Sequence, residues 1–189
     1  MELYSYSEKA KMSPMEKAKD FYDSFGWDEE GGNTQDANLW EDLRPSAKNY
    51  VSKCRRRVLK YIPESGKYML DAASGPIQFS EYLEYSENCE KRYCVDISKK
   101  ALEKAKMKIQ EHGEYFNCDL INLPFKDDVF DCAISLHTIY HIDKTQQEKA
   151  VRELIRVIKP NQNVIIVYAN SLRPLSVLLK PFILLIKIY

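Results

Sequence analysis

This 189-residue chain has no excess of charge of either sign, because its 28 lysine and arginine residues balance 28 aspartate and glutamate residues. A balanced chain has no global attraction to nucleic acid or to an anionic membrane, so we expect no nucleic-acid partner. The first 11 residues are polar and contain no apolar stretch of the kind that directs secretion. The composition therefore predicts an ordinary globular protein of one domain that works in the cytoplasm.

Patterns of cysteine and histidine that hold disulfides or metals are also missing. The five cysteines are odd in number and have no C-x-x-C spacing, which favours reduced thiols. His137 and His141 are four residues apart, but the glutamate of the H-E-x-x-H zinc motif is absent and no third ligand is evident. We therefore expect no metal site.

The glycine-rich signature of a dinucleotide site is absent as well. Residues 68–78 read YMLDAASGPIQ, a short apolar run followed by Asp71, small residues and a segment that can continue as a helix. A strand, a tight turn and a helix in this order build a ligand crevice in open α/β sheets. A pyrophosphate would need G-x-G-x-x-G, but Gly75 is the only glycine here and Pro76 has no N–H to donate. Asp71 would repel a pyrophosphate and instead favours a ligand with an ammonium and a sulfonium group, namely S-adenosylmethionine.

Acidic residues end three successive predicted strands. Asp71, Asp96 and Asp119 each close or follow a run of strand-forming residues. Because the carboxyl ends of parallel strands meet at one edge of a sheet, we expect these three side chains near one ligand. Three such acids in order are a far more specific signal than any one of them.

These motifs resemble those of the class I S-adenosylmethionine-dependent methyltransferases of small-molecule type, over residues 21–170. The family's motif I reads acid-x-Gly-x-Gly-x-Gly, and this chain has Ala73 for its first glycine and Ile77 for its third. Residues 123–131, LPFKDDVFD, resemble the segment that enters the family's fourth strand. Residues 156–168, RVIKPNQNVIIVY, resemble its following helix, turn and fifth strand.

The resemblance implies an α/β fold with a Rossmann-like, doubly wound and mainly parallel sheet. Its strand order is 3-2-1-4-5, and a helical cap precedes it in the chain. The chain would then divide into an N-terminal tail and helical cap or lid (1–62), a cofactor-binding methyltransferase core (63–170) and an apolar helical C-terminal segment (171–189).

Two helices and a loop are predicted within the cap. Ser13 and Pro14 are an N-cap residue and a first-turn proline, which favour a helix start. Residues 27–38 are polar and contain two glycines, which indicates a mobile loop and a candidate lid. A second helix over 46–61 carries Arg55–Arg57, and we expect these arginines on its solvated side.

The resemblance also implies which residues contact the cofactor. In the family an acid that ends the second strand accepts both ribose hydroxyls, and a carboxylate such as Asp96 can accept two O–H donors at once. Alternatively Asp96 only precedes a helix, but Ser98 can cap that helix and leave Asp96 free. Asp119 corresponds to the acid that accepts from the adenine amino group, with Leu120 against the ring. Tyr22 either closes over the cofactor or belongs to an aromatic core face. The implied cofactor-binding residues are Tyr22, Asp71, Ala73, Gly75, Asp96, Ile97, Asp119, Leu120 and Leu136.

The implied reaction transfers a methyl group from the sulfonium of S-adenosylmethionine to a nucleophile on a small-molecule acceptor. Because the leaving group is already cationic, the enzyme's task is mostly in-line positioning. A base is needed only when the acceptor is a hydroxyl or an acidic carbon. His137 and His141 are the catalytic candidates, since they lie in the segment that faces the methyl group and titrate near neutrality. For His141 a role in tying down a loop is an equal alternative.

Two other functions remain open, a methyltransferase-like module without catalysis and an NAD(P)-dependent reductase, which the missing glycines disfavour.

Residues 171–189 are apolar but interrupted by Pro174 and Pro181, and a membrane span needs ~20 apolar residues. We expect at most a weak membrane or hydrophobic contact from this segment. Because the family's sheet has two further strands, we also expect that the chain is incomplete and that its fifth strand is an open edge.

Overall fold

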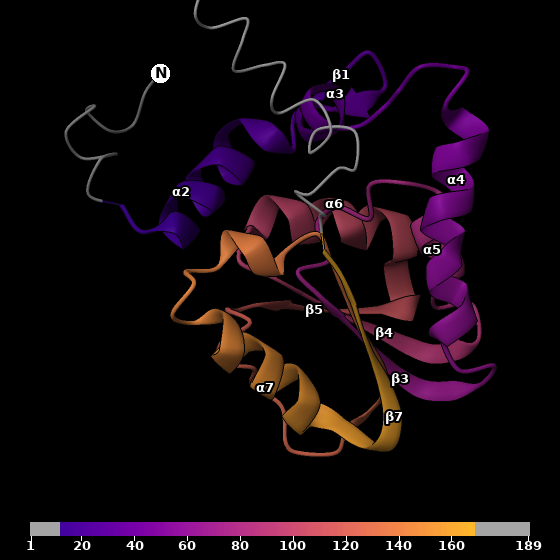
Figure 1. Ribbon diagram of the computed structural model, residues 1–189, viewed down its shortest axis with the longest axis vertical. Coiled ribbons are helices and arrows are strands. Elements are labelled where there is room, and N and C mark those ends of the chain that lie inside the picture. The colour runs from indigo at the N-terminus through magenta and orange to yellow at the C-terminus, as the bar shows by residue number, and fades with distance from the viewer. Residues whose placement is uncertain (1–11, 169–189) are drawn as a thin grey trace, which may run out of the picture.

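The computed structural model describes residues 12–168, in which a five-stranded sheet lies between two layers of helices (Figure 1). All five strands are parallel, in the order β5-β4-β3-β6-β7, which confirms the predicted order 3-2-1-4-5. The segments 1–11 and 171–189, with the helix expected in the latter, lie outside the described residues. The strands are β3 (Gly66–Ala72), β4 (Cys89–Asp96), β5 (Gly113–Asn117), β6 (Phe130–Leu136) and β7 (Ile158–Val167).

The central strand β3 is apolar on both faces because helices cover both sides of the sheet. Leu70 pairs with Tyr93 of β4 on one side and with Ala133 of β6 on the other. Leu70 and its neighbour Met69 are both fully buried, although their side chains belong to different clusters on opposite faces. An apolar run without alternation is typical of such a central parallel strand.

Helices α7 and α6 contribute apolar side chains to clusters on opposite faces of the sheet. On one face, Ala150, Leu154 and Val157 of α7 join the cluster of Leu70. On the other face, Leu102 of α6 belongs to a second cluster. Figure 1 shows α7 on one side of the sheet and α4 with α5 on the other. The helices are α2 (Pro14–Phe21), α3 (Gln35–Trp40), α4 (Lys48–Arg56), α5 (Glu81–Glu84), α6 (Lys99–Ile109) and α7 (Gln147–Val157). Among the described residues, no helix is both long and apolar enough to cross a membrane.

The cap begins as predicted but continues differently. Ser13 accepts a hydrogen bond from the backbone of Glu16, whose side chain bonds back to Ser13, so the expected helix start is confirmed. The expectation that 27–38 is a loop is wrong, because this stretch contains the hairpin β1 (Glu29–Glu30) and β2 (Asn33–Thr34) and most of α3. Its mobility and its role as a lid stay predictions. Thr34 caps α3, and Trp27 and Ala37 anchor the stretch by burial.

Arg55 also departs from expectation, because it lies against the protein rather than on a solvated face. Its guanidinium stacks 3.3 Å from the ring centroid of Phe79 and forms an ion pair with Glu41 at 3.0 Å. Arg56 pairs with Glu84 of α5. These contacts fasten α4 to α5, to the segment before α5 and to the end of α3.

Asp131, at the start of β6, joins three strands through one carboxylate. Its Oδ2 accepts hydrogen bonds from the backbone N–H groups of Lys67 (2.8 Å) and Tyr68 (3.0 Å) of β3. Its Oδ1 accepts from Nζ of Lys159 on β7, at 2.6 Å. The acid of the FD pair in the predicted fourth-strand motif therefore fixes the register of the central strands.

We predict that Asp131→Ala lowers the free energy of unfolding by about 2–3 kcal/mol, because two backbone donors and a lysine lose a charged acceptor. Urea denaturation of the full chain measures the change. Asp127→Ala is the matched control. In the described part of the chain, Asp127 forms an exposed ion pair with Arg156, so this variant should cost less than about 1 kcal/mol. Equal losses in the two variants would contradict this role of Asp131.

Candidate cofactor and acceptor site

The loop after β3 keeps the backbone that glycines would give it, although two of its residues are not glycine. Ala73 (φ 60°), Gly75 (φ 56°) and Ile77 (φ 51°) all lie in the left-handed region. For an L-residue this conformation costs roughly 1–2 kcal/mol. The Ile77 side chain is buried with Cys94 and Leu102 on the α6 side of the sheet. The bulk of Ile77 is therefore part of the core beneath the loop.

Gly75 is held from both sides. Its N–H donates a hydrogen bond to Oδ2 of Asp96 at 2.9 Å. A Cβ at this position would lie 3.4 Å from the ring of Trp27, and the positive φ would strain any side chain. A larger residue at 75 would therefore meet Trp27 of the cap first, rather than the space next to a ligand.

Asp96 is buried at the end of β4 and is not free of local contacts. Besides Gly75, it accepts a hydrogen bond at Oδ1 from the backbone N–H of Ser98, at 2.8 Å. Ser98 does cap α6 through Ala101, as expected, but the expectation that this leaves Asp96 unengaged is wrong. Burial raises the pKa of Asp96 to about 6, and the two backbone hydrogen bonds oppose that shift. Each carboxylate oxygen keeps a second lone pair, so Asp96 can still accept from a ligand.

Asp71, at the end of β3, is paired with a buried arginine that sequence reasoning missed. Arg92 of β4 donates to Oδ2 of Asp71 from Nε at 3.0 Å and also from Nη2. Burial raises the pKa of Asp71, and the guanidinium opposes the shift. Within the described residues, no hydrogen bond reaches the other oxygen, Oδ1. The only sequence signal was an arginine within a strand-forming run.

A large cavity of about 550 Å³ opens where the carboxyl ends of β3, β4 and β6 meet, and we call it the cofactor cavity. This volume is in the range of small-molecule and cofactor sites. Of the residues predicted from sequence, the cavity brings together Tyr22, Asp71, Ala73, Gly75, Asp96, Ile97, Leu136, His137 and His141. Asp36, Trp27 and Arg92 also line it and were not predicted.

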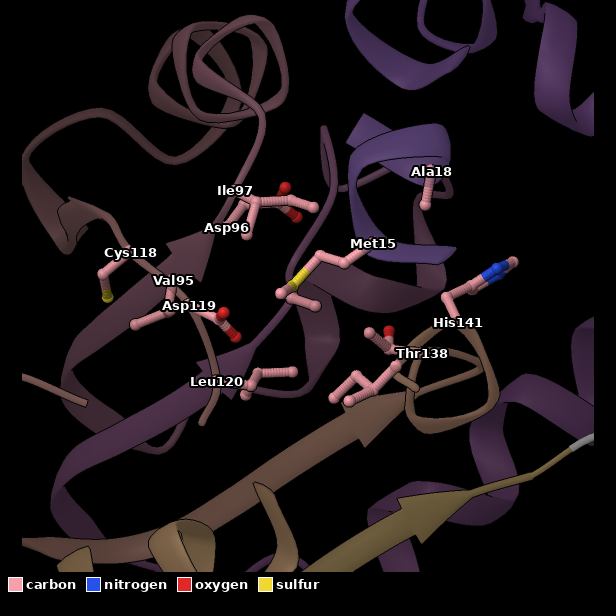
Figure 2. A pocket seen from close by; sticks show the side chains of 12 residues that line it. Met15, Ala18, Val95, Asp96, Ile97, Cys118, Asp119, Leu120, Thr138 and His141 are labelled. Carbon is pink, nitrogen blue, oxygen red and sulfur yellow. The ribbon is translucent and has the colours of Figure 1, made fainter. Parts of the chain in front are cut away.

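The two remaining predicted residues, Asp119 and Leu120, line a small adjoining cavity of about 40 Å³. Figure 2 shows the carboxylates of Asp96 and Asp119 on one side of it and His141 on the other. Met15 points into this space from α2. The carboxylate of Asp119 accepts a hydrogen bond from the backbone of Ile121, which fixes its orientation.

Trp27, which lines the cofactor cavity, has a buried ring nitrogen, Nε1, without a hydrogen-bond partner among the described residues. Its ring is stacked on Tyr22, with centroids 4.5 Å apart, and is 8% exposed. A buried donor without a partner costs about 1–3 kcal/mol, and an acceptor on a bound ligand would remove that cost.

The two predicted histidines occupy different places. His137, with a left-handed φ of 56°, directly follows β6 and lines both the cofactor cavity and a second one. His141 packs edge-on against Tyr22, with ring centroids 6.0 Å apart, on the cofactor side. Desolvation by the surrounding protein lowers the pKa of both imidazoles, so both are neutral at pH 7.

The second cavity, of about 500 Å³, lies between α4 and the strands β6 and β7. It adjoins the cofactor cavity, because Glu41, Tyr82, Leu136 and His137 line both. The rest of its wall is mainly apolar or aromatic, with two arginines: Val51, Cys54, Arg55, Arg57, Val58, Tyr61, Tyr85, Ile165, Ile166 and Val167.

Comparison with known proteins agrees with this fold. The family model described as a methyltransferase domain matches residues 70–166, just over half of the chain. The chain therefore belongs to the methyltransferase domain family, and it is a class I S-adenosylmethionine-dependent methyltransferase domain. S-adenosylmethionine is the cofactor of this class. The acidic strand ends Asp71 and Asp96 and the loop residues Ala73 and Gly75, which line the cofactor cavity, fit that group.

Relatives of known or named activity differ in their acceptors. The chain is 34% identical, over 61% of its length, to a tRNA (carboxymethyluridine(34)-5-O)-methyltransferase of Arabidopsis thaliana, of which it covers 28%. It is 40% identical, over 33% of its length, to norajmaline N-methyltransferase of Rauvolfia serpentina, of which it covers 22%. The chain thus spans about a quarter of the length of these curated relatives. Magnesium protoporphyrin IX methyltransferase of Synechocystis PCC 6803, solved with bound S-adenosylmethionine, shares the fold: TM-score 0.65, 17% identity, 86% of this chain and 79% of that one.

We predict that Ala73→Gly leaves the free energy of unfolding unchanged or raises it by up to about 1 kcal/mol. Relief of the left-handed strain offsets the extra entropy of glycine in the unfolded chain. Ala72→Gly is the control, since Ala72 is a buried strand residue outside the left-handed region, and it should lose about 1 kcal/mol or more. Thermal and urea denaturation measure the free energy of unfolding of both variants. A loss of stability in Ala73→Gly as large as that in Ala72→Gly would contradict the claim that Ala73 is strained.

Proposed function

We propose that this domain transfers a methyl group from S-adenosylmethionine to a small, largely apolar molecule held in the second cavity. The observation that carries the proposal is the junction of the two cavities at Leu136 and His137. A cofactor in one and an acceptor in the other would meet there. In-line positioning is the main task of such an enzyme, and two adjoining sites supply it.

The cofactor contacts follow from the chemistry of the lining residues. Asp96 has lone pairs left for the ribose hydroxyls. Asp119 and Leu120 would hold the adenine, the first by accepting from its amino group and the second by packing. Oδ1 of Asp71 is an acceptor for the ammonium group. Tyr22, stacked on Trp27, would close the cavity from the cap.

His137 is our choice for a base, when the acceptor is a hydroxyl or an acidic carbon. When bound, the cofactor supplies an electrophilic methyl group. A neutral imidazole can take a proton from the acceptor, and the lowered pKa keeps His137 neutral at pH 7. His141 does not line the second cavity, so we assign it to packing against Tyr22 rather than to proton transfer.

A tRNA acceptor is the second candidate, and the Arabidopsis relative is the observation that favours it. The net charge of zero gives no general attraction to a polyanion. An apolar cavity with three tyrosines favours a compact acceptor instead. A module that binds the cofactor without catalysis is distinguished by the assay below.

We predict that affinity for S-adenosylhomocysteine falls about fivefold between pH 6 and pH 5, because the ionised fraction of Asp96 falls by about that factor over this range. The ribose hydroxyls need an ionised Asp96 as acceptor. Below the pKa of about 6, Asp96 is mostly protonated in the free protein and must lose its proton when the ligand binds, which weakens binding. In the free protein the same raised pKa favours folding below about pH 4, and this contribution is lost as the pH rises through 6. Calorimetric titration measures the affinity.

Asp96→Asn separates Asp96 from other titrating groups. This variant should bind about 1–3 kcal/mol more weakly at pH 7 and should lose the pH dependence between 5 and 7. If Asp96→Asn keeps the parent's affinity and pH profile, another group binds the ribose.

The function itself is tested with methyl-labelled S-adenosylmethionine and the full chain, offered either a small-molecule extract or total tRNA. We expect label in small apolar molecules. Val51→Trp fills the second cavity from α4 and should reduce transfer at least about tenfold, while S-adenosylhomocysteine still binds. Lys53→Trp, on the same helix but outside the cavity lining, is the control and should transfer normally.

Three results would contradict the proposal. Label in tRNA alone would replace the small-molecule acceptor with a nucleic acid and leave the cofactor assignment intact. Cofactor binding without transfer to either pool would favour a non-catalytic module. Unchanged transfer by Val51→Trp would mean that the acceptor lies outside the second cavity.

A further inference from the structure

Arg92 is a buried cation in the wall of the cofactor cavity that the proposed function does not yet use. Its side chain is 1% exposed, and it is the largest fully buried side chain of the described residues. Besides the two bonds to Asp71, its Nη1 donates to the backbone carbonyl of Tyr82 at 2.5 Å. Arg92 and Asp71 both line the cavity.

The hydrogen bonds between Arg92 and Asp71 leave unused N–H donors on Arg92 and an unused acceptor oxygen on Asp71. A guanidinium has five N–H donors, and the three contacts of Arg92 leave one on each Nη nitrogen. Both bonds to Asp71 end on Oδ2, so Oδ1 receives none from the described residues. The cavity wall therefore offers an anionic acceptor and cationic donors side by side.

Stability of the fold alone is a weak reason for a buried ion pair between Asp71 and Arg92. Two charges taken out of water lose hydration that their mutual attraction only partly returns, and apolar residues of similar volume are often as stabilising. The amino-acid end of S-adenosylmethionine carries an ammonium and a carboxylate. These two charges are complementary to Asp71 and Arg92 in sign and in number.

We propose that Arg92 binds the carboxylate of the methionine portion of the cofactor, while Oδ1 of Asp71 receives its ammonium. The inference rests on the proposed use of S-adenosylmethionine and deepens it. The fixed fork of the guanidinium lets Arg92 hold Asp71 with one edge and a ligand carboxylate with its remaining donors. A lysine at this position could not do both.

The test compares two ligands that differ only in the amino-acid end. S-adenosylhomocysteine carries it, and 5′-methylthioadenosine lacks it. We expect Arg92→Lys to weaken S-adenosylhomocysteine at least about tenfold in calorimetric titration and to change 5′-methylthioadenosine less than about twofold. Arg156→Lys, which alters another multiply bonded arginine outside the cavity lining, should change neither. Equal losses for both ligands, or no loss, would overturn the proposal.

Two further measurements decide the matter if Arg92→Lys does not fold. The double variant Asp71→Leu with Arg92→Met removes both charges together, and it should bind S-adenosylhomocysteine no more tightly than 5′-methylthioadenosine. In the parent chain, S-adenosylhomocysteine should bind at least about tenfold more tightly than its decarboxylated analogue. A retained preference in the double variant, or equal affinities in the parent, would overturn the inference. A parent chain that binds neither nucleoside would instead refute the proposed function.

Discussion

The buried carboxylate of Asp96 ties together the two segments between which the cofactor cavity opens. It accepts the N–H of Gly75 from the loop after β3 and the N–H of Ser98 at the start of α6. Burial raises the pKa of this group to about 6, so the free protein carries a poorly solvated charge at neutral pH. Additional donors from a ligand would stabilise that charge. The two backbone hydrogen bonds hold this acceptor in place before a ligand arrives, which lowers the cost of binding.

The N-terminal cap is held in place by contacts with the start of α6, the helix that follows Asp96. Ser98 Oγ donates to Oδ1 of Asp23, and Lys100 of α6 pairs with Asp28 at 2.5 Å. Exposed ion pairs contribute less than about 1 kcal/mol each, so the buried ring of Trp27 over Gly75 is the stronger contact. Cap, loop and α6 therefore meet around Asp96, and the second cavity lies beyond them, between α4 and the strands β6 and β7.

Much of the fold was predictable because its signals are local. Short apolar runs, each ended by an acid, indicated parallel strands and their common edge. The strand order, which the family resemblance implied, is confirmed. Nine of the eleven predicted site residues line one cavity, with Asp119 and Leu120 in the adjoining one. Their individual roles remain predictions.

What the sequence could not reveal depends on contacts between distant residues. The pairing of Arg92 with Asp71 joins positions 21 residues apart, and a lone arginine in a strand does not indicate its partner. The stretch 27–38 read as a loop because it is polar, and only the burial of Trp27 and Ala37 shows why it folds. Likewise, the left-handed backbone at Ala73 and Ile77 contradicts the usual preference of these residues.

The central claim is that one cavity holds the cofactor and that its methyl group points through the junction at His137 into the second. A crystal structure of the full chain with S-adenosylhomocysteine tests this most directly. We predict ribose hydroxyls within about 3 Å of the Asp96 carboxylate and the sulfur facing Leu136 and His137. A ligand whose sulfur faces away from the second cavity, or whose ribose makes no contact with Asp96, would contradict the account.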